Sequence, residues 1–256
     1  MESQNQSDRT VDEWLAALEQ RHFADLTPSE VARALRALSS CYVERRAKLA
    51  DGGALGSAGK RAAFALFYAP IHFLIVRHIV RSLALTPDEV GQVLDLGCGT
   101  GSAGAAWALE CHATISGVDR HPWVVAEANW TYRQLGLRGR AVQSDIARAR
   151  LDPARGAGTI AAYAINELPD PVRDATLGRL IDASNRGSQV LIVEPIARRL
   201  TPWWTSWTDA FMAAGGRADE WRFPGMLPQR QRQLAKAAGL NPAELTARSL
   251  WLPGRL

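Results

Sequence analysis

Residues 93 to 104 read Val-Leu-Asp-Leu-Gly-Cys-Gly-Thr-Gly-Ser-Ala-Gly, and this stretch decides the fold. Its apolar start predicts a short buried strand over 93–96, its glycines predict a loop, and residues 103–109 predict a helix. Glycine suits such a loop because the turn needs unusual backbone angles and because a ligand must approach bare main chain at the helix N-terminus. The pattern indicates a nucleotide site whose ligand depends on Asp95.

Two kinds of cofactor fit this loop. Gly99, Gly101 and Gly104 satisfy the G-x-G-x-x-G spacing of a dinucleotide site. Asp95, however, stands two residues before the first glycine, where a carboxylate favours a ligand that carries an ammonium group. The full Asp-x-Gly-x-Gly-x-Gly pattern resembles motif I of the class I S-adenosylmethionine (SAM)-dependent methyltransferases. The resemblance implies that SAM is the cofactor and that it is bound by the residues of this motif, namely Asp95, Gly97, Cys98, Gly99 and Gly101.

From residue 93 onward, strand and helix patterns alternate, which predicts parallel βαβ units. The expected fold is α/β: a doubly wound, mostly parallel, seven-stranded-type sheet of the Rossmann-like methyltransferase form. An α-helical extension over residues 1–60 precedes the methyltransferase domain over 61–256. The predicted strands are 93–96, 113–118, 140–143, 158–165 and 188–193, and an edge strand is expected over 244–251.

Two further carboxylates follow predicted strands. Asp119 ends the second strand and lies 20 residues beyond Gly99, close to the spacing at which an acid accepts hydrogen bonds from ribose hydroxyls. Asp145 follows the third strand. The family resemblance implies that this acid and its neighbour Ile146 contact the adenine edge, whereas the local sequence also fits a helix N-cap at Asp145.

The fourth predicted strand ends in Asn166 and Glu167. Ligands of an open α/β sheet bind outside the carboxyl ends of the strands, so these side chains are expected where the methyl group is transferred. We expect Asn166 to orient the acceptor and Glu167 to be the candidate base. Some members of the superfamily read Asn-Pro-Pro-aromatic or Asp-Pro-Pro-aromatic at this point. Here Glu167-Leu168 replaces the two prolines, which leaves their mechanism without support.

The elements Asn166-Glu167-Leu168-Pro169 and Val193-Glu194-Pro195 resemble one branch of the superfamily, the small-ribosomal-subunit methyltransferase-like proteins of bacteria and mitochondria. The resemblance spans residues 64–196 and implies RNA or a ribosome-associated molecule as the acceptor. It fails beyond that span, because the cysteine-rich C-terminal segment of that branch is missing. Two alternatives remain: a small-molecule methyltransferase, and a SAM-binding ribosome assembly factor without catalytic activity.

Apolar residues at helical spacing predict N-terminal helices around residues 11–18 and from residue 28 to about 49. Residues 52–59 are expected to form a flexible loop. Pro70 is expected to open a helix that runs to about residue 83. In many class I methyltransferases a helix of this kind closes over the cofactor, so the resemblance implies that Tyr68 and His72 face SAM. Both could equally be packed at a junction.

Composition excludes several other classes of protein. Hydrophobic residues make up 47% and charged residues 22% of the 256 residues, as in a soluble globular protein. No apolar run reaches the roughly 18 to 20 residues of a membrane span. Residues 1–10 are polar, so we expect a disordered lead-in to a cytoplasmic protein. The three cysteines show no metal spacing. Cys98 is therefore expected to be a small residue between glycines, rather than a nucleophile or metal ligand.

Positive charge gathers in the tail, where residues 198–256 carry nine Lys and Arg against four Asp and Glu. Within residues 198–226 tryptophans at 203, 204, 207 and 221 alternate with arginines at 198, 199, 217 and 222. Such a segment could stack on unpaired RNA bases. It could equally form a substrate lid packed on the end of the sheet, and the sequence leaves both interpretations open.

Overall fold

The computed structural model describes residues 2–44, 55–85, 89–151, 156–196, 201–240 and 242–254. The chain divides into two compact units. The first comprises Met1–His72 and Phe223–Leu245, and the second comprises Phe73–Arg222 and Thr246–Leu256. The expected boundary at residue 60 stays a prediction, and residues 223–245 belong to the same unit as the N-terminal helices.

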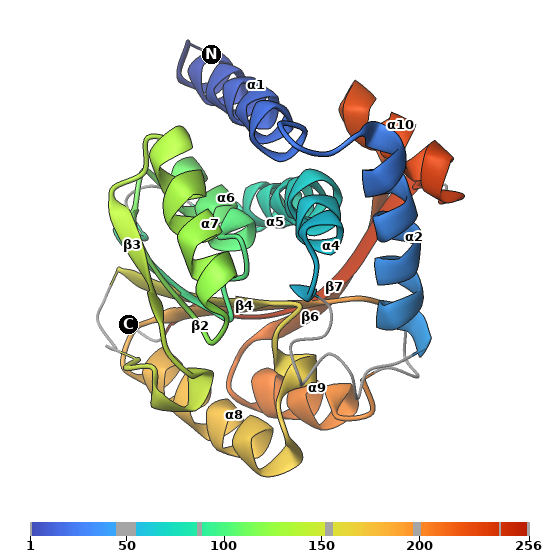
Figure 1. Cartoon of the computed structure of the whole chain (residues 1–256). Coiled ribbons are helices and arrows are strands. Elements are labelled where there is room, and N and C mark those ends of the chain that lie inside the picture. Colours follow the sequence, from blue (N-terminus) through green and yellow to red (C-terminus); the bar gives the residue numbers. More distant parts are fainter. Residues whose placement is uncertain are drawn as a thin grey trace. The chain divides into compact units, whose positions relative to one another are not determined.

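The second unit is built on a seven-stranded sheet with the order β3-β2-β1-β4-β5-β7-β6 (Figure 1). The strands are β1 (Gln92–Leu96), β2 (Thr114–Asp119), β3 (Gly139–Gln143), β4 (Ala157–Ala162), β5 (Gln189–Glu194), β6 (Arg217–Pro224) and β7 (Glu244–Leu252). The first five are parallel, and β7 runs antiparallel to β5. This arrangement confirms the expected Rossmann-like methyltransferase fold.

Helices cover both faces of this sheet. One face carries α6 (Ser102–Glu110) and α7 (Pro122–Gln134), and the other carries α8 (Asp170–Asn185) and α9 (Trp204–Ala213) (Figure 1). Every residue of β4 and β5 is buried, as expected for parallel strands covered on both sides. Because β1, β2, β4 and β5 are parallel, their carboxyl ends meet at one edge of the sheet, where a ligand site is expected.

The end of the sheet differs from the prediction in one respect. The strand expected at the edge over 244–251 lies inside the sheet, between β5 and β6. The true edge strand, β6, was missed because its residues alternate between exposed and half-buried and because residues 198–226 were expected to form a lid or a binding segment. Trp221 of β6 donates its indole N–H to Ser249 Oγ of β7 at 2.8 Å, so this tryptophan is part of the sheet.

The first unit contains α1 (Glu2–His22), α2 (Pro28–Glu44), α4 (Ala58–Ala63) and α10 (Gln229–Ala238). The expectation of a disordered lead-in over residues 1–10 is wrong, since α1 already begins at Glu2 and pairs Arg9 with Glu13 one turn later. The predicted loop over 52–59 is also shorter than expected, because Ser57 caps a helix that begins at Ala58. Residues 45–54, which include the expected end of the second helix, lie outside the described residues.

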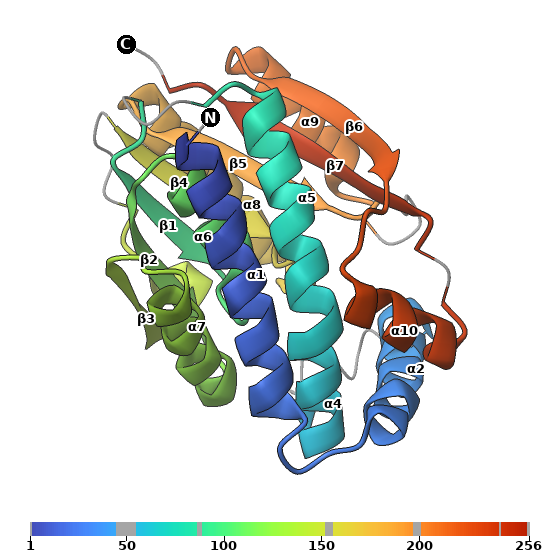
Figure 2. The same cartoon turned by 90° about the horizontal axis from the view of Figure 1, so that it is seen from above.

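In this unit α2 and α10 lie side by side (Figures 1 and 2). Arg36 of α2 donates to the carbonyl oxygens of Ala237 and Ala238 at the end of α10, at 2.9 and 3.3 Å. Cationic groups stabilise a helix C-terminus because the last carbonyls have no intrahelical partner. This contact joins two segments that are about 200 residues apart in the sequence.

Pro70 does not open a helix, contrary to the prediction. The π-helical turn η2 (Phe64–Tyr68) joins α4 directly to α5 (Ala69–Ser82), and the N–H of Ala69 bonds to the carbonyl of Phe64. Proline cannot donate to the carbonyl four residues before it. The buried side chain of Gln231 supplies that donor, with Nε2 2.9 Å from Leu66 O. A wider turn and a side chain from α10 together accommodate the proline.

The resulting helix, Ala58–Ser82, is long and apolar enough to cross a membrane by length and composition. No apolar run of this length was expected from the sequence. Core helices of soluble proteins pass the same test, and 67% of the most apolar window is buried within the protein. We interpret it as a core helix.

Candidate active site

The glycine loop between β1 and α6 has the backbone geometry that only glycine adopts readily. Gly97, Gly99 and Gly101 have φ angles of +70°, +51° and +80°. The loop is tied to β2, because the N–H groups of Gly97 and Cys98 both donate to Val118 O, at 2.9 and 3.0 Å. A Cβ at Gly97 would lie 2.6 Å from Ala164 Cβ. The predicted motif residues therefore form one rigid turn at the carboxyl edge.

Asp95 lies beneath this loop and is 1% exposed. Its Oδ2 accepts the N–H of Gly104 in the first turn of α6 at 3.0 Å, and a Cβ at Gly104 would lie only 2.5 Å from that oxygen. Burial raises the pKa of Asp95 to about 7; the Gly104 N–H opposes this shift and the charge of Asp119 adds to it. Asp95 thus holds the loop to its helix, and its direct contact with a ligand ammonium stays a prediction.

Asp119 ends β2 and is half-buried. Its Oδ2 accepts the N–H of Gly99 at 3.0 Å, and its Oδ1 accepts the N–H of His121 at 2.9 Å. A carboxylate has about four acceptor sites, so each oxygen can accept a second hydrogen bond. This position beside the open side of the glycine loop fits the predicted role of binding ribose hydroxyls.

Cys98 is buried between the glycines of the loop. Burial, followed by the charges of Asp95 and Asp119, raises the pKa of its thiol well above the ordinary value. A cysteine nucleophile reacts as the thiolate, so this environment opposes such a role. Among the described residues no group of three metal-ligating side chains occurs.

Asp145 and Ile146 lie after the carboxyl end of β3. Asp145 caps the short 3₁₀ turn η3 (Ile146–Arg148), with Oδ1 accepting the N–H of Ala147 at 2.8 Å. Ile146 is buried, and its Cδ1 would lie 3.2 Å from a Cβ at Gly97. Asp145 is therefore a cap as the local sequence indicated, and its contact with adenine remains a prediction.

Tyr68 belongs to the first unit, where its ring lies 6.0 Å from Phe64 and 6.1 Å from His72. Burial raises its pKa, and a hydrogen bond with Ser39 opposes the shift. Phe64, His72 and Ser39 belong to the same unit. Its role toward SAM stays a prediction.

The candidate catalytic residues lie in the 3₁₀ turn η4 (Ile165–Glu167), directly after β4. Asn166 is half-buried and held at two points: its backbone N–H donates to Glu194 Oε1 at 3.2 Å, and its Oδ1 accepts the indole N–H of Trp203 at 3.3 Å. An indole nitrogen can only donate, which identifies the amide oxygen as its partner. Glu167, by contrast, is exposed.

Glu194 and Tyr163 also belong to this edge, and the sequence analysis gave them no role. Glu194 ends β5, is fully buried and lies opposite Arg248 of β7 in the strand register. Tyr163 follows β4 with a φ of +60°, which is strained for a side chain of this size. The Val-Glu-Pro element was a signal for Glu194, but a positive φ at a tyrosine leaves no trace in the sequence.

The tryptophan segment packs against this edge. Trp203 and Trp207 are buried, with their rings 4.9 Å apart, and the Arg248 guanidinium lies 4.0 Å from the ring of the half-buried Trp204. A buried ring offers no open face to a base, so this part of the segment matches the lid interpretation. Arg217 pairs with Asp219, and Arg198 and Arg199 lie outside the described residues.

Comparisons with known proteins agree with this geometry. A family model for a methyltransferase domain matches residues 93–187. No curated protein matches the sequence at a significant level.

The structure is similar to the methyltransferase domain of bacterial CtHen1-C, at 14% identity and a TM-score of 0.50, over 73% of this chain and 98% of that one. It also resembles SAM-dependent methyltransferases from Geobacter sulfurreducens and Thiobacillus denitrificans, both solved with S-adenosyl-L-homocysteine. These are 16% and 13% identical, cover 70% of this chain and 90% of theirs, and each give a TM-score of 0.47. At such identities a structural likeness shows the fold alone.

The family match spans both halves of the site, from the glycine loop at the end of β1 to Asn166 and Glu167 after β4. Asp119 lies beside the loop and accepts the N–H of Gly99. The seven-stranded sheet brings the two halves to one edge. Residues 93–187 therefore match a methyltransferase domain, the sheet that carries them has the Rossmann-like methyltransferase fold, and SAM is the expected cofactor.

Proposed function

We propose that this enzyme methylates RNA at the edge formed by Asn166 and Glu167. The observation that carries the proposal is the contrast between these neighbours, since Asn166 is anchored by two hydrogen bonds and Glu167 is exposed. An anchored amide can orient an acceptor, and an exposed carboxylate can be reached by an acceptor too large to be enclosed.

SAM would supply a methyl group that its sulfonium already activates. The protein therefore has to bind SAM, align the acceptor with the methyl group and remove a proton from the acceptor. The glycine loop and Asp119 are the residues that would hold it. The indole N–H of Trp203 holds the amide plane of Asn166 in one orientation, and this fixed amide would orient the acceptor. Glu167 would accept the proton that the acceptor loses.

Three features support RNA as the acceptor class. The Asn-Glu-Leu-Pro and Val-Glu-Pro elements resemble a branch that acts on the small ribosomal subunit. The chain carries a net charge of +4, which favours an anionic partner. The positive charge gathers in residues 198–256, which carry nine Lys and Arg against four Asp and Glu.

The test incubates the purified protein with SAM labelled in its methyl group and with three separate pools: total RNA, small ribosomal subunits and protein-free metabolites. We expect acid-precipitable label that ribonuclease releases, and its loss in Asn166→Ala and Glu167→Gln. Asp209→Asn, an acid on α9, is the matched control and should retain activity. Label confined to the metabolite pool would replace RNA by a small molecule.

A further inference from the structure

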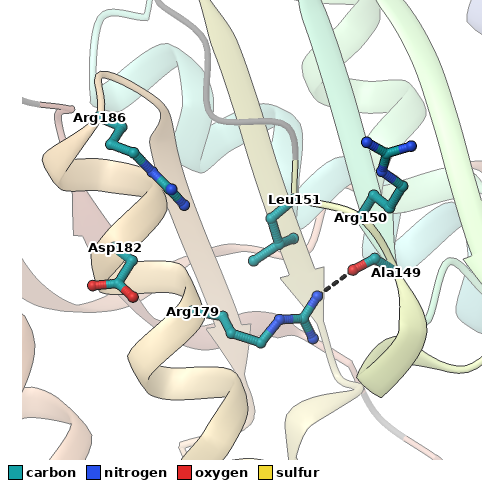
Figure 3. A pocket seen from close by; sticks show the side chains of 6 residues that line it. All are labelled: Ala149, Arg150, Leu151, Arg179, Asp182 and Arg186. Atoms are coloured by element: carbon teal, nitrogen blue, oxygen red, sulfur yellow. Dashed lines mark hydrogen bonds between the residues drawn. The ribbon is translucent and has the colours of Figure 1, made fainter.

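A basic pocket of about 380 Å³ lies beside α8 (Figure 3). It is formed by α8 and by the segment that follows η3, and its lining residues are Ala149, Arg150, Leu151, Arg179, Asp182 and Arg186. Three arginines and one aspartate therefore line this pocket. The methyl-transfer chemistry described above uses none of these residues.

Arg179 of α8 lines this pocket. Its guanidinium donates to the carbonyl oxygens of Ile146, Ala147 and Ala149, and so binds α8 to the η3 segment. These partners are neutral, and the described residues provide Arg179 with no ion pair. Its position is fixed while its positive charge remains uncompensated, which is the arrangement of a preorganised anion site.

Arg186 follows the last turn of α8 and is exposed. In Figure 3 its side chain and that of Arg179 both extend from α8 toward Leu151. Asp182 lies one helical turn before Arg186, yet neither side chain makes a hydrogen bond or ion pair with the part of the chain that the structure describes. The Arg186 guanidinium is thus able to bind an anionic partner from outside the chain.

We propose that this pocket binds a phosphate group of the RNA backbone. Guanidinium groups bind phosphate through paired N–H donors, and a fixed guanidinium loses little freedom on binding. The proposal rests on the proposed function, since it names the contact that holds the RNA acceptor. Arg179 also links the pocket to Ile146, so the RNA contact lies next to the segment expected to contact adenine.

The experiment measures binding of a fluorescein-labelled oligouridylate to the full chain by anisotropy over a salt titration. Arg186→Glu should weaken binding by about tenfold at low salt and make the log-log salt slope shallower by roughly 0.7 for each phosphate that the variant no longer neutralises. Arg133→Glu is the matched control, because Arg133 is exposed on α7 and the charge change is the same. It should change affinity less than about twofold.

Asp182→Asn gives a change of opposite sign, because removal of the one carboxylate of the pocket should strengthen binding by about two- to threefold. Equal losses in Arg186→Glu and Arg133→Glu would overturn the proposal, as would an unchanged affinity in Asp182→Asn. Inorganic phosphate is the second probe: if it binds the parent as tightly as the oligouridylate, the pocket takes a free phosphate and the RNA contact is overturned.

Thermal unfolding of each variant excludes misfolding as the cause. The outcome is separable from that of the proposed function, because methyl transfer to RNA by the parent is measured independently. RNA methylation together with equal binding by both charge-reversal variants would leave the function standing and remove the pocket. Loss of binding in Arg186→Glu without any RNA methylation would support the pocket and remove the function.

Discussion

In both the cofactor half and the acceptor half of the site, a buried carboxylate accepts a backbone N–H from a turn, but the two residues are closer in sequence in the cofactor half. At the end of β1 the buried Asp95 accepts an N–H from Gly104, nine residues later in the same βα unit. At the end of β5 the buried Glu194 accepts an N–H from Asn166, 28 residues earlier and on the neighbouring strand's turn. Each carboxylate fixes the turn beside it. The first fixes a cofactor loop, and the second fixes the residue expected to orient the acceptor.

The surroundings of the two carboxylates differ in charge. Asp95 lies near a second acid, Asp119, which adds to the rise of its pKa caused by burial. Glu194 lies opposite Arg248 in the strand register. Burial of an acid without a cation is costly for the charged form, whereas an acid that faces a cation is compensated. The comparison predicts that pH and added side-chain volume at the cofactor half change the stability of the protein. At the acceptor half, loss of a single hydrogen bond should change methyl transfer.

The largest effect is expected from Asp95→Asn, through pH. The pKa of Asp95 is about 7 in the folded chain and near 3.8 when unfolded, so between these values only the folded state keeps the proton. The parent therefore loses stability as pH rises from about 4 to 7, by on the order of 4 kcal/mol at most. Asparagine does not titrate. The stability of the variant relative to that of the parent should therefore increase as pH rises across that window.

Denaturant unfolding of both proteins at a series of pH values measures this difference. Cys98 and Tyr132 lie near Asp95, but burial raises the pKa of both well above the ordinary value, so they do not titrate in this window. Parallel stability curves for parent and variant would show that Asp95 is not the titrating group.

A somewhat smaller effect is expected from Gly104→Ala. The added methyl would lie 2.5 Å from Asp95 Oδ2, in a buried position with little room to relax. Overpacking of this kind costs about 3 kcal/mol at its upper range. Gly178→Ala on α8 is the control, because no atom lies within 4 Å of its added Cβ. It should stabilise the helix by roughly 0.5–1 kcal/mol, and equal effects would contradict the account of Asp95.

The smallest effect concerns the acceptor half. Trp203→Phe keeps an aromatic ring but removes the N–H that holds Asn166 Oδ1, at a cost of about 1 kcal/mol. Trp207→Phe is the matched control, since its buried Nε1 has no hydrogen-bond partner among the described residues. We expect methyl transfer to fall in the first variant alone, with SAM affinity unchanged in both. Equal turnover in the two would remove Trp203 as a positioning residue.

The features that could be predicted from the sequence depend on interactions between residues that are close together in the chain. The strands and helices from residue 92 to 194 appear in the hydrophobic pattern because each buries its own face. Asp95 and the loop glycines could be identified because the turn imposes its backbone angles within a few residues. Asp119 lies in the adjacent βα unit, at a spacing that the fold fixes.

The features that were missed depend on distant partners. Pro70 is tolerated within a helix because Gln231, far along the chain, bonds to the carbonyl that the proline leaves. The internal place of β7 depends on its pairing with β5, and β6 has too polar a pattern to stand out. Trp203 was identified only as part of an aromatic segment, since its bond to Asn166 links residues 37 positions apart.

The central claim is that SAM is held by the glycine loop and Asp119, and a calorimetric titration of the full chain tests it most directly. The account predicts binding of SAM to the parent and a loss of about 1.5–3 kcal/mol in Asp119→Ala, the scale of a hydrogen bond to a charged group. Asp209→Ala should bind as the parent does. Undiminished SAM affinity in Asp119→Ala, or tight binding of NAD in place of SAM, would contradict the claim.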